Sequence, residues 1–206
     1  MQETVKRRAT YADLEAVPEH LVAEILHGRL VTHPQPTGEH GEVHFSLGLL
    51  IGAVYRQGIG TRGGWRFINE PELHFNGDVA VPELAGWRIE RLPVPPAPDP
   101  LKPVKIRLAP DWVCEVLSPS TEKYDRGDKR DIYAEGGVRY LWLVDPRIET
   151  LEAFEFISRR WTLIGTYQTD AVVRAAPFED LDINLGQLWP PVPATRLAPP
   201  PEDQST

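Results

Sequence analysis

The sequence predicts an α/β (α+β) fold, in which a mixed β-sheet core is flanked by helices, and the clearest evidence is a strand–helix–strand unit. Residues 111–117 and 140–144 are short apolar runs of the kind that form buried strands. Residues 121–135 between them are expected to form a helix opened by Thr121, so that the unit is a crossover within one sheet. Short β-rich runs separated by turn residues precede and follow this unit, which predicts further strands on both sides.

The first part of the chain is expected to supply two helices and a turn. Residues 11–18 form a short helix, and residues 21–31 form either a hairpin or a helix-to-strand transition with a turn at Gly28. Residues 42–58 carry apolar side chains at helical spacing, which predicts an amphipathic helix packed on the core and ended by Gly58.

The remaining strands are predicted from their turns. Asn76-Gly77 is the strongest hairpin signal in the chain, because both residues accept the backbone conformation of a tight turn. A proline-dense segment, residues 92–103, is expected to be a loop or flap. The strands expected around these features, the last three as a meander, are residues 65–68, 72–75, 79–84, 150–156, 161–167 and 172–174.

Length and composition indicate one ordinary globular domain. The chain has 206 residues, of which 41% are hydrophobic and 25% charged. We expect a single domain over residues 1–190 and a proline-rich, disordered tail over residues 191–206. The only cysteine, Cys114, can form no internal disulfide, which favours a cytoplasmic setting, and no apolar run is long enough to cross a membrane.

The net charge of −8 argues mildly against a nucleic-acid partner, because proteins that bind nucleic acid usually present a basic face. A cluster of carboxylates that binds cations would contribute negative charge of this kind, and the bound cations would offset it locally. The overall charge therefore does not decide whether this protein binds nucleic acid.

The most informative residue is Glu115, which interrupts the apolar strand 111–117. An ionised carboxylate in such a strand is costly unless it is paired with a cation. It either faces solvent or an arginine at the strand edge, or it binds a metal ion.

Acidic residues also gather around the segment VPELAGWR, in which Glu83 follows Pro82. Glu70, Glu72 and Asp78 lie upstream. Two or three convergent carboxylates are enough to hold Mg²⁺, which keeps several waters. Spacing alone is weak evidence for such a site.

The helix at 121–135 can place three basic side chains and a tyrosine on part of one face at spacings of three and four residues, namely Arg126, Lys129, Arg130 and Tyr133. Lys129 is placed to orient a water or to stabilise charge on a scissile phosphate. Alternatively, this is a solvated, salt-bridged face, since acidic residues are interleaved with the basic ones.

The histidines give no comparable signal. His40 and His44 have the spacing of one helical face, but a third ligand is missing, and the chain contains no HExxH pattern. We therefore predict no zinc site.

Several of these segments together resemble the Uma-type putative restriction endonuclease family. The resemblance is carried by DWVCEVLSPST and DRGDKRDIYAEGGVRYLWLVDP, is extended by EPELHF, VPELAGWR and AEILHGRLV, and covers roughly residues 10–190. The family belongs to the PD-(D/E)xK superfamily. The resemblance thus implies a restriction-endonuclease-like sheet core flanked by helices, and hydrolysis of phosphodiester bonds with Mg²⁺ (or Mn²⁺).

The resemblance also implies site residues. The superfamily's two motif acids fall on Glu83 and Glu115, and an early acid falls on Glu24. Two departures matter, because the first acid is usually an aspartate and because Leu117 stands where the motif has its lysine. Lys129 is the candidate to replace that lysine.

The roles that follow are those of a metal-dependent nuclease. Glu83 and Glu115, with a main-chain carbonyl near Val116, would hold one ion, and Asp78 is the reserve ligand. Lys129 would position water, and Glu24 would help a second metal ion. The basic residues beside the flap, which would contact the nucleic-acid backbone, are Lys102, Lys105 and Arg107.

We therefore predict a metal-dependent nuclease that acts on nucleic acid, DNA in the first instance, as a homodimer. The alternative of a different class is a catalytically compromised module on the same fold that binds nucleic acid or another protein. A third interpretation is a hydrolase of small phosphate esters.

Overall fold

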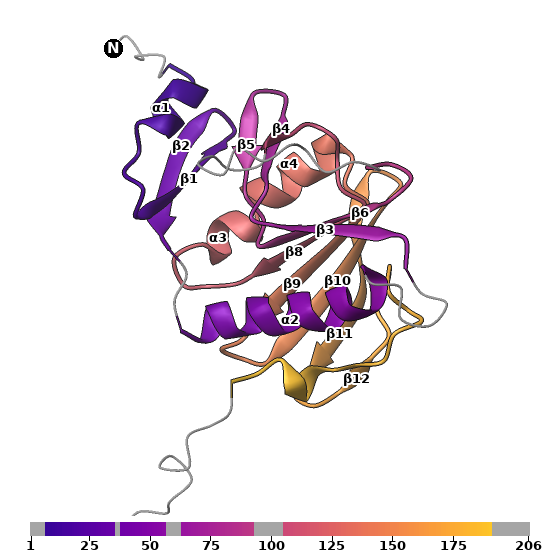
Figure 1. Ribbon diagram of the computed structural model, residues 1–206. Helices are drawn as coiled ribbons and strands as arrows, with labels where there is room; N and C mark the ends of the chain where they lie inside the picture. Colours follow the sequence, from indigo (N-terminus) through magenta and orange to yellow (C-terminus); the bar gives the residue numbers. More distant parts are fainter. Residues whose placement is uncertain (1–6, 36–37, 57–62, 93–104, 191–206) are drawn as a thin grey trace, which may run out of the picture.

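Two mixed β-sheets form the framework of the computed structural model (Figure 1). The structure describes residues 7–35, 38–56, 63–92 and 105–190. Most of the predicted flap with Lys102, the predicted helix end at Gly58 and the predicted tail therefore lie outside the described residues. Within the described residues, no helix is long and apolar enough to cross a membrane.

The larger sheet has six strands in the order β11-β10-β9-β8-β6-β3. Its strands are β3 (Trp65–Asn69), β6 (Leu84–Arg88), β8 (Trp112–Val116), β9 (Tyr140–Asp145), β10 (Thr150–Ile157) and β11 (Arg160–Gln168).

The smaller sheet has five strands in the order β2-β1-β5-β4-β7. Its strands are β1 (Leu21–Leu26), β2 (Arg29–Pro34), β4 (Glu72–Phe75), β5 (Asp78–Ala80) and β7 (Lys105–Ile106). The single mixed sheet that the sequence predicted is thus two sheets.

The central crossover is confirmed. β8 and β9 are parallel neighbours, and the chain between them is helical. The predicted single helix is instead two, α3 (Glu122–Asp125) and α4 (Asp128–Gly136). The break falls at Gly127, where a Cβ atom would lie 2.9 Å from the Lys123 carbonyl oxygen. Because glycine has no Cβ atom, it lets the backbone at residue 127 approach the Lys123 carbonyl more closely than any other residue would.

The two predicted tight turns also form. β1 and β2 make a hairpin, as do β4 and β5 across Asn76-Gly77. Asn76 and Gly77 have φ values of 51° and 88°, the positive values that such a turn needs. Of the two alternatives for residues 21–31, the structure contains the hairpin.

The predicted strand 79–84 is wrong, and the difference matters for the site. The chain leaves the smaller sheet after Ala80 and enters the larger one at Leu84, where it begins the unpredicted strand β6. Pro82 lies in the crossing segment, and proline cannot donate to a strand ladder. Glu83 therefore precedes a strand instead of ending one, and it lies beside β8.

The larger sheet has a hydrophobic core on each face. The helix α2 (Glu39–Tyr55) covers one face and buries Val43, Leu47 and Ile51 there, as predicted (Figure 1), but it is not amphipathic, because Phe45 and Leu49 are exposed on its outer face. Because side chains alternate along a strand, Cys114 on β8 packs in the core beneath α2, while Val113 packs in the core on the opposite face. Glu115 shares the face of Val113, and its carboxyl therefore points toward α4.

The end of the chain departs from the predicted meander. β10 and β11 form the expected hairpin. The next strand, β12 (Val172–Val173), does not continue their sheet, because it pairs with β13 (Ile183–Asn184). The chain turns away at Thr169, whose φ is 51°, and the following segment buries Phe178 in the core beneath α2. A short 3₁₀ helix, Leu185–Gln187, follows β13.

Candidate active site

The site begins at the end of β8, where its neighbour β6 diverges. The pairing of β6 with β8 starts at Leu84 opposite Cys114, so the backbone of Val116 has no strand partner on that side. Side chains take the place of the missing strand. The Val116 N–H donates to Glu83 Oε2 at 3.1 Å, and the Val116 carbonyl oxygen lies 2.6 Å from His40 Nε2.

The same divergence brings the carboxyls of Glu83 and Glu115 close together, although 31 residues separate them in the sequence. Burial raises the pKa of Glu83 to about 6 and the pKa of Glu115 well above its usual value. Two buried carboxyls this close cannot both carry their charge cheaply, so either a proton on one of them or a cation between them would relieve the repulsion.

Lys129 supplies the positive charge beside Glu115. Its Nζ lies 2.8 Å from Glu115, 3.1 Å from Asp125 and 3.4 Å from Glu24, and it donates to the Val81 carbonyl oxygen at 3.0 Å. Burial would lower the pKa of Lys129, but the surrounding carboxylates outweigh this effect and raise the pKa well above its usual value. Lys129 is only 3% exposed and stays an ammonium ion, so the alternative of a solvated helix face is wrong for this residue.

Asp125 and Tyr133 belong to the same network, although the sequence did not single them out for it. Both lie four residues from Lys129, on either side of it along the chain. The Tyr133 hydroxyl donates to Glu115 Oε1, and burial followed by the charge of Glu115 raises the pKa of this phenol. The spacing of four residues was the available signal for the contact between Asp125 and Lys129, whereas nothing local indicated that Tyr133 would reach Glu115.

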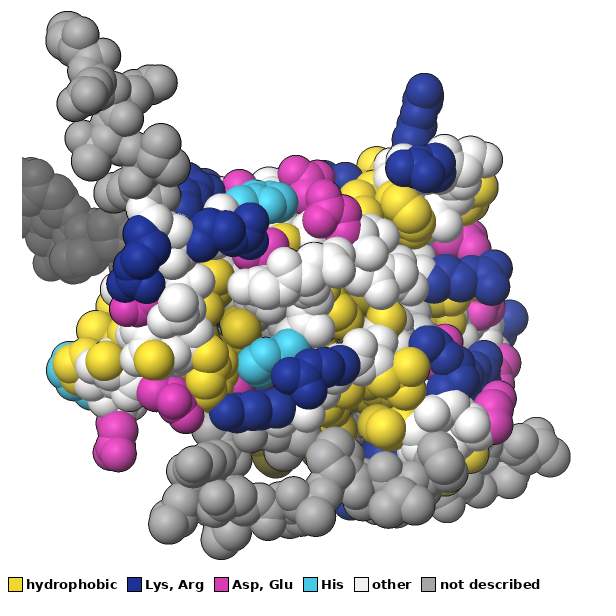
Figure 2. Space-filling view, turned by 90° about the horizontal axis from the view of Figure 1, so that it is seen from above, with side chains coloured by type: hydrophobic (Ala, Val, Ile, Leu, Met, Phe, Trp, Pro, Cys, Tyr) yellow, Lys and Arg dark blue, Asp and Glu magenta, His cyan; other side chains and the backbone are white. Residues whose placement is uncertain are grey.

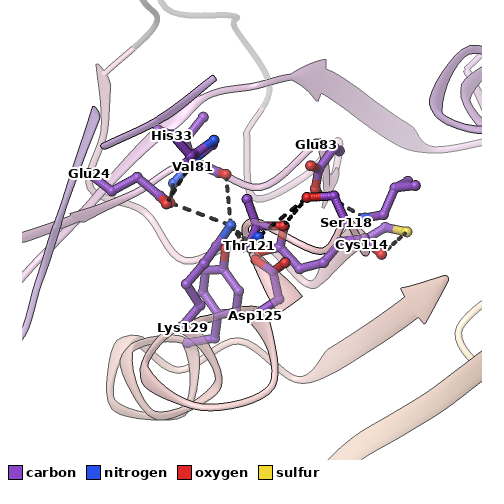
Figure 3. Close-up of polar contacts among 12 residues, drawn as sticks. Glu24, His33, Val81, Glu83, Cys114, Ser118, Thr121, Asp125 and Lys129 are labelled. Atoms are coloured by element: carbon purple, nitrogen blue, oxygen red, sulfur yellow. Dashed lines mark hydrogen bonds and ion pairs between the residues drawn. The ribbon is translucent and has the colours of Figure 1, made fainter. Parts of the chain in front are cut away.

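Glu24 lies on the other side of Lys129 from Glu83 (Figure 3). Its Oε1 accepts from the Val81 N–H at 2.8 Å, and its Oε2 lies 3.4 Å from His33 Nε2. Burial alone would raise the pKa of Glu24, but Lys129 and His33 outweigh it and lower this pKa. Glu24 therefore provides a permanent negative charge that holds Lys129 in place.

Asp78 is not part of this group. Its Oδ1 accepts from the Gly28 N–H at 2.8 Å and from Arg8 at 3.1 Å, so it braces the β1–β2 hairpin. Lys105, the described lysine beside the predicted flap, has its Nζ 3.6 Å from the centre of the Tyr11 ring.

His40 is the site residue that sequence reasoning missed. Its Nε2 lies 3.1 Å from Glu83 Oε1 as well as 2.6 Å from the Val116 carbonyl oxygen. Burial lowers the pKa of His40, which favours the neutral imidazole. No local sequence pattern indicated this contact, because it joins two distant segments, the first turn of α2 and the end of β8.

A pocket of about 350 Å³ gives access to this group from one side. Glu83 and His40 reach the pocket wall, whereas Glu115 is fully buried behind them. The rest of the wall offers hydroxyls and a guanidinium that suit a polar, anionic ligand, namely those of Ser118, Ser120, Thr121 and Arg147.

The donor atoms present fit a hard divalent ion that keeps part of its water. Within the described residues, no three or more Asp, Glu, His or Cys side chains are arranged as a group that could hold a metal ion by themselves. Glu83, Glu115 and the Val116 carbonyl are an open set of oxygen donors, which is how Mg²⁺ and Mn²⁺ are commonly bound. Among the described residues, Glu115 Oε2 is buried and accepts no N–H or hydroxyl hydrogen bond, and a cation would satisfy it.

The surface shows no single basic face in the view of Figure 2. Lys and Arg side chains of the described residues form separate groups there, with acidic, apolar and histidine side chains between them. This distribution agrees with the net charge of −8.

Comparison with known proteins places the chain in a family. No curated protein matches it. It resembles the crystal structure of a putative nuclease of the DUF820 family from Anabaena variabilis ATCC 29413, with a TM-score of 0.68, 21% identity, and coverage of 88% of this chain and 97% of that one. The sequence profile of the Uma2 family, described as putative restriction endonuclease, matches residues 8–186. The chain therefore belongs to the Uma2 family of putative restriction endonucleases.

Proposed function

We propose that this protein is a metal-dependent endonuclease that hydrolyses phosphodiester bonds of DNA, with its catalytic centre at Glu83, Glu115 and Lys129. The observation that carries the proposal is a pair of neighbouring, buried carboxyls beside the backbone of Val116 and a buried ammonium ion. Membership of the Uma2 family supports the nuclease class. The choice of DNA and of a metal ion is our inference from the site chemistry and the PD-(D/E)xK resemblance.

Both departures from the usual motif are compatible with this role. Glu83 is one methylene longer than aspartate, yet its carboxylate reaches both Glu115 and the Val116 N–H. Leu117 is a buried core residue in the place of the motif lysine, but Lys129 brings its ammonium group to 2.8 Å from Glu115.

Each residue then has a defined task. Glu83, Glu115 and the Val116 carbonyl would hold the ion, which when bound polarises the phosphate and lowers the pKa of a coordinated water. Lys129 remains protonated, so it donates hydrogen bonds or neutralises charge and does not act as a base. Tyr133 orients the Glu115 carboxyl, while Asp125 and Glu24 hold Lys129 in position.

The pocket beside Glu83 sets where the substrate enters. Its hydroxyls and Arg147 are suited to a phosphate group, although Arg147 is also bound to Asp145 and Glu122 within 2.7 Å. A cytoplasmic location and a homodimer, which would place two sites on the two strands of DNA, remain predictions from the sequence.

The proposal is tested by incubating the purified protein with supercoiled plasmid in Mg²⁺ or Mn²⁺. We expect the plasmid to be nicked with either ion and to stay intact in chelator. Retention of the plasmid without cleavage would favour the alternative, a binding module with a compromised site. Turnover of a model phosphodiester with no action on plasmid would favour a hydrolase of small esters.

A further inference from the structure

We propose that His40 is a ligand of the divalent ion at the Glu83–Glu115 centre, and that it gives this centre a preference for a first-row transition ion such as Mn²⁺ over Mg²⁺. The inference rests on the proposed function, because it adds one ligand to the same centre. It differs from the ligand set that the sequence predicted, which consisted only of oxygen atoms.

The positions of the donor atoms carry the argument. His40 Nε2 faces two oxygen atoms at once, the Val116 carbonyl oxygen at 2.6 Å and Glu83 Oε1 at 3.1 Å. Two ligand atoms that each lie about 2.1 Å from one ion, at right angles to each other, are about 3.0 Å apart. The observed separations are close to those of neighbouring ligands around a single ion.

A purely structural histidine accounts for this arrangement less well. The N–H of Nε2 needs one acceptor, whereas here two strong acceptors converge on it. His40 Nδ1 is buried and has no hydrogen-bond partner among the described residues, so the two oxygens at Nε2 favour the tautomer with its proton on Nε2. A cation bound between these oxygens would replace that proton at Nε2, and Nδ1 is free to carry it.

The fold holds the ring in this place. His40 lies in the first turn of α2, which Val43 and Leu47 anchor in the hydrophobic core. The side chain is 10% exposed and lies on the wall of the pocket beside Glu83. The ring is thus positioned before any ion arrives, and the ion can still be reached from the pocket.

The chemical nature of the ligand atoms explains the preference for Mn²⁺ over Mg²⁺. Mg²⁺ favours oxygen ligands and retained waters, whereas imidazole is a ligand suited to first-row transition ions. Two carboxylates and a carbonyl alone would suit Mg²⁺ well. Adding one imidazole nitrogen shifts the balance toward an ion such as Mn²⁺.

The test compares His40→Gln with His44→Gln. Glutamine keeps an N–H donor for the Val116 carbonyl but removes the imidazole. His44 lies one turn further along α2, lines a different pocket with Phe45 and Phe67, and interacts with the backbone of Glu83 and not with its carboxyl, so it controls for changes in helix packing. The folded proteins are titrated with Mn²⁺ and with Mg²⁺ by calorimetry, and bound Mn²⁺ is examined by electron spin echo spectroscopy for coupling to ¹⁴N.

We expect His40→Gln to weaken Mn²⁺ binding by roughly 100-fold, because losing a direct ligand should cost at least as much as losing a residue that only orients one. Mg²⁺ binding should fall much less. The ¹⁴N coupling should be present in the wild type and in His44→Gln, and absent in His40→Gln.

Glu115→Gln separates failure of this inference from failure of the proposed function. If Glu115→Gln loses Mn²⁺ while His40→Gln binds it like the wild type and no ¹⁴N coupling is seen, His40 is not a ligand and the metal centre stands. If the wild type binds no Mn²⁺, or if all variants bind it equally, both proposals are overturned.

Discussion

Replacing Lys129 by methionine is expected to lower the free energy of unfolding by roughly 3–5 kcal/mol, the usual cost of removing one partner from a buried ion pair. The ammonium group lies within 3.4 Å of three carboxyls and is 3% exposed. Methionine fills a similar volume, but it leaves Glu24 and Asp125 without their counter-charge and the Val81 carbonyl without its donor. Urea denaturation measures the change.

Two further variants make this result interpretable. Lys123→Met, an exposed lysine on the neighbouring helix α3, should change stability by less than about 0.5 kcal/mol. Asp125→Asn combined with Lys129→Met should recover part of the loss, because it removes one of the unpaired charges. A Lys129→Met protein as stable as the Lys123→Met control would contradict the account of a charged, buried Lys129.

Glu115→Gln is expected to lower the rate of plasmid nicking by roughly a thousandfold, which corresponds to about 4 kcal/mol of lost transition-state stabilisation. The variant should fold normally. Its amide oxygen can still accept from Tyr133 and Lys129, and its NH₂ group can donate to Glu83. The lower nicking rate would then reflect a lost catalytic group and not an unfolded protein.

Glu72→Gln is the matched control. Glu72 is also a buried carboxyl, 4% exposed, but it binds Tyr11 and His74, away from the carboxyl pair. Initial nicking rates of the two variants and the wild type are compared at one protein concentration. Retained cleavage by Glu115→Gln, or equal losses in both variants, would exclude Glu115 as the centre of the chemistry.

The sequence predicted those parts of the fold and site that depend on local patterns. The crossover from β8 to β9 follows from two apolar runs with a helical segment between them. Glu115 stood out because a charge in an apolar strand needs a partner, and its partners proved to be Lys129 and Tyr133. These conclusions required no knowledge of distant contacts.

The parts of the fold and site that sequence reasoning missed depend on where neighbouring strands diverge. Residues 79–84 read as one strand, but the chain changes sheets around Pro82, and only that crossing places Glu83 beside Val116. The same divergence leaves the Val116 carbonyl open to His40. Asp78 was the reserve ligand in the sequence, but it lies on the smaller sheet, and its carboxylate accepts a hydrogen bond from the Gly28 N–H.

The most direct test of the central claim is to locate a bound ion by anomalous diffraction from a crystal grown with Mn²⁺. We predict a single strong peak within about 2.3 Å of a carboxylate oxygen of Glu83, a carboxylate oxygen of Glu115 and the Val116 carbonyl oxygen. A peak at another cluster of residues, in a protein that nicks plasmid, would contradict the assignment of the catalytic centre to the end of β8.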